Sequence, residues 1–172
     1  MGLPIKRFIA ANNRNDVFLE YLQTAVYTPR PSVPTIANAM DVGNPSNFAR
    51  ILDLFSSKED THQAICELIS GYRFTDEEIG ETMKQTYKQA GYILDPHGAC
   101  GYQALLDNQL TQNETGVFLE TAHPAKFKGT VDTILEADIE IPEKLQAFMQ
   151  GEKQSVELNK DFEGFKQYLM QQ

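Results

Sequence analysis

The sequence contains no tryptophan, two cysteines and three histidines among its 172 residues. Cys66 and Cys100 lie far apart and show no paired spacing, so the sequence predicts neither a disulfide nor a metal site. We interpret both as small buried thiols in a reducing compartment.

Basic residues are also scarce, with 15 lysines and arginines against 24 acidic residues and a net charge of −9. This balance, with the basic residues scattered, argues against binding to nucleic acid or to anionic membranes. No apolar run approaches membrane-spanning length, and the N-terminus lacks the apolar core of a signal peptide. These absences favour a cytoplasmic protein.

Motifs for phosphate binding and covalent catalysis are missing too. The run Gly98-Ala99-Cys100-Gly101 lacks the spacing of a phosphate-binding loop and is interpreted as a helix start. Lys126 falls on a predicted amphipathic helix and is expected to be solvated. His62 is interpreted as an ordinary surface histidine. Spacing alone therefore assigns no catalytic residue.

His97 and His123 share a local context, because each follows a predicted strand and adjoins a proline. Such a pair could act in acid–base catalysis, or each histidine could stabilise its own turn. The sequence leaves both interpretations open.

A strand, a tight turn and a helix are predicted in the stretch from Gly116 to Phe127. The apolar run Val117-Phe118-Leu119 is rich in strand formers, and Pro124 suits the first turn of a helix. Thr121 ends the strand and would present its hydroxyl where ligands bind in parallel α/β sheets.

Two further strands are predicted, Ile5–Ala11 and Tyr92–Leu94. Apolar spacing and capping signals also predict a series of helices. These are Val17–Leu22 capped by Asp16, a helix from Gly43 through Phe55, Ser57–Ser70, Thr75–Ala90 stopped by Gly91, Pro96–Leu106, Pro124–Leu135, a helix from Ile141, and Asp161–Met170. Thr75 and Glu78 have the spacing of a capping box at the start of their helix. We expect one α/β unit over residues 1–172, with a helical tail over residues 140–172.

Three strand-to-helix turns in this prediction carry polar side chains, namely Asn12–Asp16, Asp95–His97 and Thr121–His123. Right-handed crossovers would bring all three to one edge of one parallel sheet. The sequence therefore predicts a candidate site at that edge, without indicating a reaction.

Several of these stretches resemble one enzyme family. Leu119-Glu120-Thr121-Ala122-His123-Pro124-Ala125-Lys126-Phe127 is similar to the C-terminal signature of threonine synthases of the bacterial and fungal type. The stretch from Thr35 to Phe48, the Asp95-Pro96-His97 turn and the opening residues 2–12 resemble the same family. The resemblance extends over nearly the whole chain but covers only the back part of that enzyme.

The resemblance implies a fold, a cofactor and a reaction. It implies part of a tryptophan synthase β-like domain (fold type II), with a short parallel sheet and flanking helices. Such enzymes use pyridoxal phosphate (PLP) to convert O-phosphohomoserine and water into threonine and phosphate, and are carbon–oxygen lyases acting on phosphates. The resemblance assigns Thr121 to the pyridine nitrogen, Ala39 to the ring face and Asp95 to the ring edge.

The same resemblance implies that two parts of the site lie upstream of residue 1, namely the lysine that holds PLP and the phosphate-binding loop. We therefore expect the chain alone to be inactive. Its partner would be the N-terminal portion of the same enzyme, and alone it is expected to self-associate in a non-native way. The alternatives are another fold type II lyase, such as a threonine dehydratase, and a non-catalytic α/β module.

Overall fold

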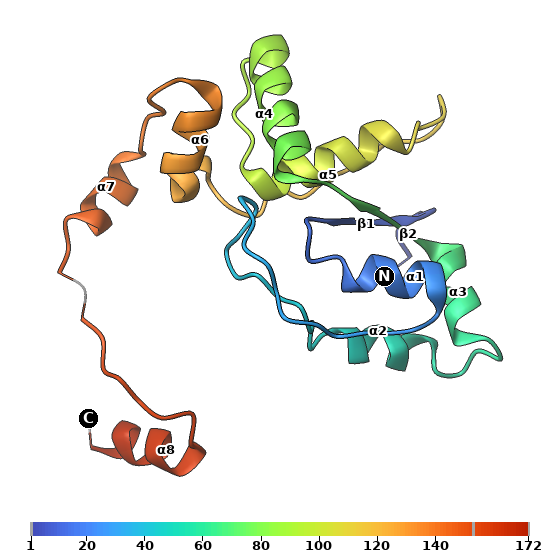
Figure 1. The fold of residues 1–172 in the computed structure, drawn as a ribbon, viewed down its shortest axis with the longest axis horizontal. Coiled ribbons are helices and arrows are strands. Elements are labelled where there is room, and N and C mark those ends of the chain that lie inside the picture. The colour runs from blue at the N-terminus through green and yellow to red at the C-terminus, as the bar shows by residue number, and fades with distance from the viewer. Residues whose placement is uncertain (1, 153, 172) are drawn as a thin grey trace. The chain divides into compact units, whose positions relative to one another are not determined.

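The computed structural model describes residues 2–152 and 154–171. The chain divides into two compact units, one ending at Ile139 and one beginning at Glu140 (Figure 1). Within the described residues no helix is long and apolar enough to cross a membrane.

The first unit is built on a two-stranded parallel sheet of β1 (Phe8–Asn12) and β2 (Ile69–Arg73), with Phe8 opposite Ile69. The connection between the strands contains α1 (Val17–Thr24), α2 (Phe48–Phe55) and α3 (Thr61–Leu68). Figure 1 shows these helices on one side of the strands and α4 (Asp76–Ala90) and α5 (Pro96–Asp107) on the other. The unit is therefore an α/β arrangement around a short parallel sheet.

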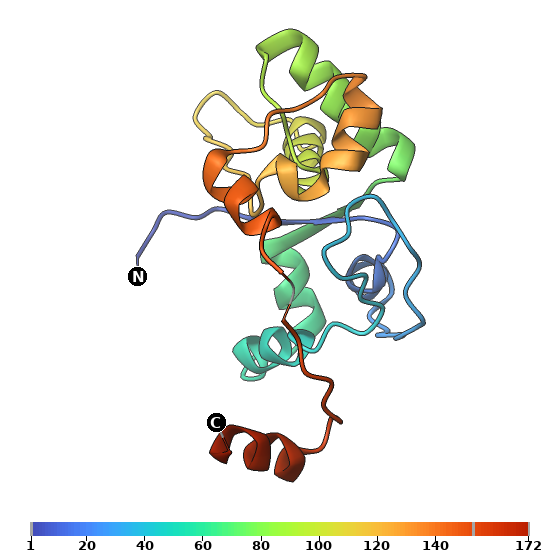
Figure 2. The same ribbon diagram turned by 90° about the vertical axis from the view of Figure 1, so that its left-hand side faces the viewer.

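The buried core has two parts, one on each side of the sheet. The smaller contains Tyr21, Phe48 and Ile65, and the Tyr27 ring stacks on Phe48 at 4.1 Å between centroids. The larger lies among α4, α5 and α6 (Lys128–Leu135), and Ile9 and Ala11 of β1 pack against it (Figure 2). Its buried members are Ala37, Phe74, Ile79, Met83, Leu94, Ala99, Cys100, Ala104, Val131 and Ile139.

Capping residues fix the ends of the helices in this larger part. Thr75 and Glu78 form the predicted capping box of α4, and Gly91 ends that helix with a φ of 65°. Asp95 caps α5, because its side chain accepts a hydrogen bond from the His97 amide. The capping box and the Gly91 stop were predicted from the sequence, and both predictions are confirmed.

The chain then runs through the 3₁₀ helix η1 (Pro124–Phe127) into α6. Pro124 occupies the first turn of η1, as predicted. The second unit contains α7 (Glu143–Met149) and α8 (Phe162–Met170), and Asp161 caps α8 through the Gly164 amide at 2.8 Å.

Two predicted strands are absent from the described structure. Tyr92–Leu94 and Val117–Leu119 are extended segments without a paired neighbour, so neither belongs to the sheet. Strand propensity alone does not make a strand, because a ladder needs a partner at the right distance.

The first two residues of β2 were predicted as the end of a helix. The helix expected over Ser57–Ser70 ends at Leu68, and Ile69 is already extended. Gly71 in β2 lies close to α1, because a Cβ there would lie 2.9 Å from Leu19 Cδ1 and would displace that side chain. Gly71 and Ser70 give β2 a weak strand propensity, and the close approach of α1 accounts for the glycine.

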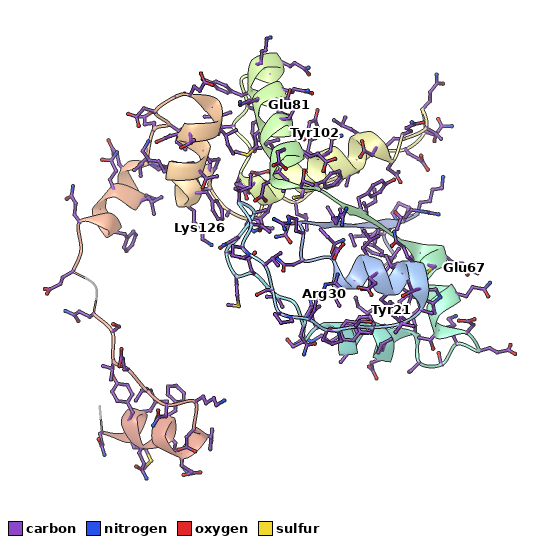
Figure 3. All side chains as sticks on the ribbon, viewed as in Figure 1. Tyr21, Arg30, Glu67, Glu81, Tyr102 and Lys126 are labelled. Carbon is purple, nitrogen blue, oxygen red and sulfur yellow. The ribbon has the colours of Figure 1, made fainter. Side chains whose placement is uncertain are left out.

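Asp16 precedes α1 but does not cap it with its side chain, contrary to the prediction. Its carboxylate instead pairs with Arg30 and, at 3.5 Å, with Arg73. Figure 3 shows Arg30 beside α1, where it also pairs with Glu20. Asp16 therefore ties the long loop after α1 to the end of β2.

Candidate functional site

Two of the predicted polar turns are joined directly. The Asp95 amide donates a hydrogen bond of 2.8 Å to Glu120 Oε1. Asp95 itself is completely buried, and its Oδ1 accepts from the His97 amide at 2.8 Å and contacts His97 Nδ1 at 2.9 Å. The turn that carries Thr121 is therefore anchored to the N-terminus of α5.

Gly98 provides the space for the Glu120 carboxyl group. A Cβ atom at position 98 would lie only 1.8 Å from Glu120 Oε2. This oxygen and Asp95 Oδ2 are both buried and accept no hydrogen bond within the described structure. The two acidic side chains thus face each other at the helix start.

Burial affects the two carboxyl groups differently. It raises the pKa of Glu120 to about 7, with the nearby Asp95 charge adding to the increase. For Asp95, burial also acts to raise the pKa, but hydrogen bonds from His97 outweigh it, and the pKa lies below its ordinary value. Below about pH 7 the pair therefore favours one protonated and one ionised carboxyl group.

The two histidines each hold their own turn. His97 contacts the Asp95 carboxylate, and its ring lies 5.2 Å from that of Phe127. His123 Nδ1 accepts a hydrogen bond of 3.1 Å from the Ala125 amide. Of the two interpretations left open by the sequence, these contacts favour turn stabilisation.

Thr121 is exposed in the turn between these anchors. Glu120 before it is bound to Asp95, and His123 after it caps η1. Lys126 is exposed as predicted, and Figure 3 labels it on η1, where its Nζ lies 5.6 Å from the Phe127 ring centre. The threonine hydroxyl is thus presented by a fixed stretch of backbone.

The loop that carries Ala39 is held by a network of polar side chains. Asn13 Nδ2 donates to Thr35 Oγ1 at 2.9 Å and to the Ala37 carbonyl at 3.0 Å. Asp41 accepts from Thr35 Oγ1 at 3.0 Å and from Asn15 Nδ2 at 3.1 Å. The loop is therefore fastened to the turn after β1, while Ala39 itself is exposed.

The predicted site residues lie close in sequence or by hydrogen bond to members of one buried cluster, although Ala39 and Thr121 are themselves exposed. Ala37, two residues before Ala39, packs in the same buried cluster as Leu94, which precedes Asp95. Thr121 is connected to Asp95 through Glu120. The roles assigned to Thr121, Ala39 and Asp95 stay predictions, since the structure contains no ligand that would test them.

Sequence reasoning missed Glu120 as a site residue. The feature of the sequence that could have identified it is the position of an acidic residue directly after the apolar run Val117-Phe118-Leu119. In the structure Phe118 and Glu120 are partly buried, whereas Val117 and Leu119 are 77% and 75% exposed. This alternation places the carboxyl group on the inner face of an extended segment.

A second polar cluster lies between α1 and α3, and it contradicts two predictions. His62 is partly buried, with Nε2 3.1 Å from the carbonyl oxygens of Tyr21 and Leu22, so it is not an ordinary surface histidine. Cys66 is only partly buried and lies 3.3 Å from the same nitrogen. Burial raises the pKa of the Cys66 thiol, which favours an unreactive structural group. No metal-binding group occurs among the described residues.

Comparison with known proteins gives one consistent match. A sequence profile described as "Threonine synthase, C-terminal" matches residues 98–169. The threonine synthase of Haemophilus influenzae is 42% identical over 170 residues, covering 99% of this chain and 39% of that protein. That of Escherichia coli is 39% identical over 171 residues, covering 99% and 38%. The chain therefore spans about two fifths of the length of these relatives.

Solved structures agree with this match. The crystal structure of Escherichia coli threonine synthase superposes with a TM-score of 0.82 at 39% identity, over 99% of this chain and 38% of that one. The structure of PLP-bound threonine synthase from Brucella melitensis gives a TM-score of 0.82 at 28% identity, over 99% and 41%. The α/β fold predicted from the sequence is thereby confirmed, and the chain belongs to the threonine synthase family, in which it corresponds to the C-terminal part.

Proposed function

We propose that this chain forms the C-terminal part of a PLP-dependent enzyme that converts O-phosphohomoserine and water into threonine and phosphate. The observation that carries this proposal is the match to threonine synthases over 99% of the chain at 39% to 42% identity. One structural neighbour is described as PLP-bound.

The turn at Thr121 fits a role in holding PLP. An exposed hydroxyl on a turn anchored at both ends can hydrogen-bond the pyridine nitrogen of the cofactor. PLP, when bound, supplies an electron sink for the substrate. A neutral hydroxyl does not favour a protonated ring nitrogen as a carboxylate would, and this suits elimination and replacement better than transamination.

Ala39 and Asp95 fit this arrangement in different ways. Ala39 is small and exposed on a loop fixed by Asn13 and Asp41, so it can pack against the face of a flat ring. Asp95 is completely buried and bonded to His97 and Glu120. We therefore propose that Asp95 positions the turns at the ring edge.

We further propose that the isolated chain is inactive. The resemblance matches neither the PLP-bearing lysine nor the phosphate-binding loop of the family to any of these 172 residues. The alternatives of another fold type II lyase and a non-catalytic module have no structural observation in their favour.

A chimeric enzyme tests the proposed function. The part of Escherichia coli threonine synthase matched by this chain is replaced with residues 1–172, and phosphate release from O-phosphohomoserine is measured. We expect activity. A chimera that folds and binds PLP but releases no phosphate would contradict the proposal.

Thr121→Asp in the chimera tests the role of the hydroxyl. A carboxylate there should favour a protonated ring nitrogen, change the cofactor absorbance and increase transamination. Thr115→Asp is the matched control, because Thr115 is exposed in the same extended stretch. Identical spectra and product ratios for both variants would show that Thr121 does not contact the ring.

A labelling experiment tests the inactivity of the isolated chain. With PLP followed by borohydride, we expect weak labelling spread over surface lysines. Stoichiometric labelling of one lysine would show that the chain carries its own PLP-bearing residue.

A further inference from the structure

Two buried oxygen atoms in the candidate site accept no hydrogen bond within the described structure, Asp95 Oδ2 and Glu120 Oε2. The other oxygen of each carboxyl group is in use, since Asp95 Oδ1 contacts His97 and Glu120 Oε1 accepts from the Asp95 amide. The two side chains are neighbours at the start of α5, because the Asp95 amide holds the Glu120 carboxyl group there. Two ionised carboxylates in this position would offer only acceptors and would repel each other.

One proton between the two carboxyl groups satisfies both free oxygens. We propose that Glu120 is held as a neutral carboxylic acid that donates a hydrogen bond to Asp95, and that this acid–carboxylate pair fastens the Thr121 turn to the start of α5. Asp95 remains the ionised partner because its Oδ1 faces both the amide and the ring nitrogen of His97. Glu120 accepts only one N–H, from the Asp95 amide.

The surroundings of the pair support this assignment of the proton. Burial raises the pKa of Glu120 from 4.5 to about 7, whereas the pKa of Asp95 lies below 3.8. The titratable groups that lie beside Glu120 are Asp95 and His97. From α5, the buried Cys100 also senses the Asp95 charge, which together with burial raises its own thiol pKa to about 12.

The pair acts as a pH-dependent latch between two turns. When Glu120 loses its proton, Glu120 Oε2 and Asp95 Oδ2 repel each other. The Glu120 side chain can then move away from its position against Gly98. The Asp95 amide then loses its acceptor. The latch itself does not depend on the proposed function. Its effect on how Thr121 is presented to PLP rests on that function. In the proposed reaction Glu120 is therefore a positioning residue.

Carboxyl carbon NMR of the full 172-residue chain, labelled with ¹³C-glutamate, tests the proton assignment. We expect one glutamate to titrate near pH 7, far from the ordinary range of about 4 to 5. That resonance should disappear in Glu120→Gln and persist in Glu77→Gln, a matched change at an exposed position. A chain in which every glutamate titrates in the ordinary range would overturn the proposal.

Asp95→Asn tests whether the proton is shared or Glu120 is merely buried. The amide of asparagine can donate to an ionised Glu120, and the neighbouring negative charge is gone, so we expect the Glu120 midpoint to fall by about one pH unit or more. An unchanged midpoint would mean that burial alone holds the proton, and the proposed pair would be wrong.

Hydrogen exchange at the Asp95 amide measures the latch itself. After correction for the intrinsic pH dependence of exchange, we expect protection to fall above the Glu120 midpoint in the unchanged chain. Protection should stay constant in Glu120→Gln, because glutamine can donate to Asp95 at every pH. Equal pH profiles for both proteins would contradict the latch. None of these measurements uses PLP, so they are independent of the chimeric enzyme.

Discussion

Gly98 packs directly against the carboxyl group of Glu120, so this position has no room for a methyl group. Gly98→Ala should displace Glu120 and destabilise the chain by about 1–3 kcal/mol, as overpacking usually does. Gly129→Ala in α6 is the matched control, because a Cβ there meets no atom within 4 Å. It should leave stability unchanged or raise it by up to about 1 kcal/mol. Urea unfolding of the two variants distinguishes these outcomes.

The raised pKa of Glu120 also leads to a prediction of how the stability of the chain depends on pH. Its native pKa of about 7 exceeds the ordinary 4.5, so the native state binds more protons than the unfolded state between these values. The free energy of unfolding should therefore fall as the pH rises through this window and level off above it. Asp95 acts in the opposite sense, since its lowered pKa contributes stability that is lost in acid, below 3.8.

Denaturant unfolding at pH 5 and pH 8 checks this dependence. The difference in unfolding free energy between the two pH values should be smaller in Glu120→Gln than in the unchanged chain. If the difference in unfolding free energy between pH 5 and pH 8 is equal or larger in Glu120→Gln, the pH dependence of stability comes from other groups.

Single residues were predictable where a local rule applied. The Thr75–Glu78 capping box and the Gly91 stop involve positions close in sequence, and each is confirmed. The burial of Glu120 depends on Gly98, 22 positions earlier, and no local pattern contains this information. Sequence reasoning therefore found the turn and missed the side chain that anchors it.

At the scale of helices, the capping box gives a direct prediction for α4. The Thr75 hydroxyl accepts from the Glu78 amide at 3.3 Å, and the Thr75 amide donates to Glu78 at 2.7 Å. Thr75→Ala should cost about 0.5–2 kcal/mol of stability. Thr133→Ala on the exposed face of α6 is the control and should change stability little. Thermal unfolding that ranks the two variants equally would show that the box does not contribute.

Helices were predicted better than strands for a physical reason. A helix closes its hydrogen bonds within one segment, so the spacing of apolar residues and the caps largely specify it. A strand needs a partner elsewhere in the chain. Val117–Leu119 has strand-like residues but no partner in the described structure, whereas β2 has a partner and contains Ser70 and Gly71.

At the scale of the whole molecule, exposed apolar side chains favour the association of one copy of the chain with another. Leu3, Ile5 and Phe8 lead into or begin β1 and are 48% to 69% exposed, and Val117 and Leu119 are exposed further still. Such side chains beside extended backbone favour pairing with another chain. We expect the isolated chain to self-associate at micromolar concentration.

Sedimentation velocity measures this association. Leu119→Ser should weaken it, whereas Thr115→Ser in the same stretch should not. A compact monomer that binds no hydrophobic dye would show that the chain covers its own surfaces, and would favour an independent domain.

The parallel pairing of β1 with β2 has a consequence for how the chain folds. Phe8 pairs with Ile69, so the pairing closes a loop of about sixty residues, at an entropic cost that grows with loop length. Helices α4 and α5 are neighbours in sequence and pack on each other. We therefore expect α4 and α5 to assemble first and the sheet to form late, since contacts between distant residues slow folding. During that interval the backbone N–H and C=O groups of each strand lack a partner strand and could pair with another chain.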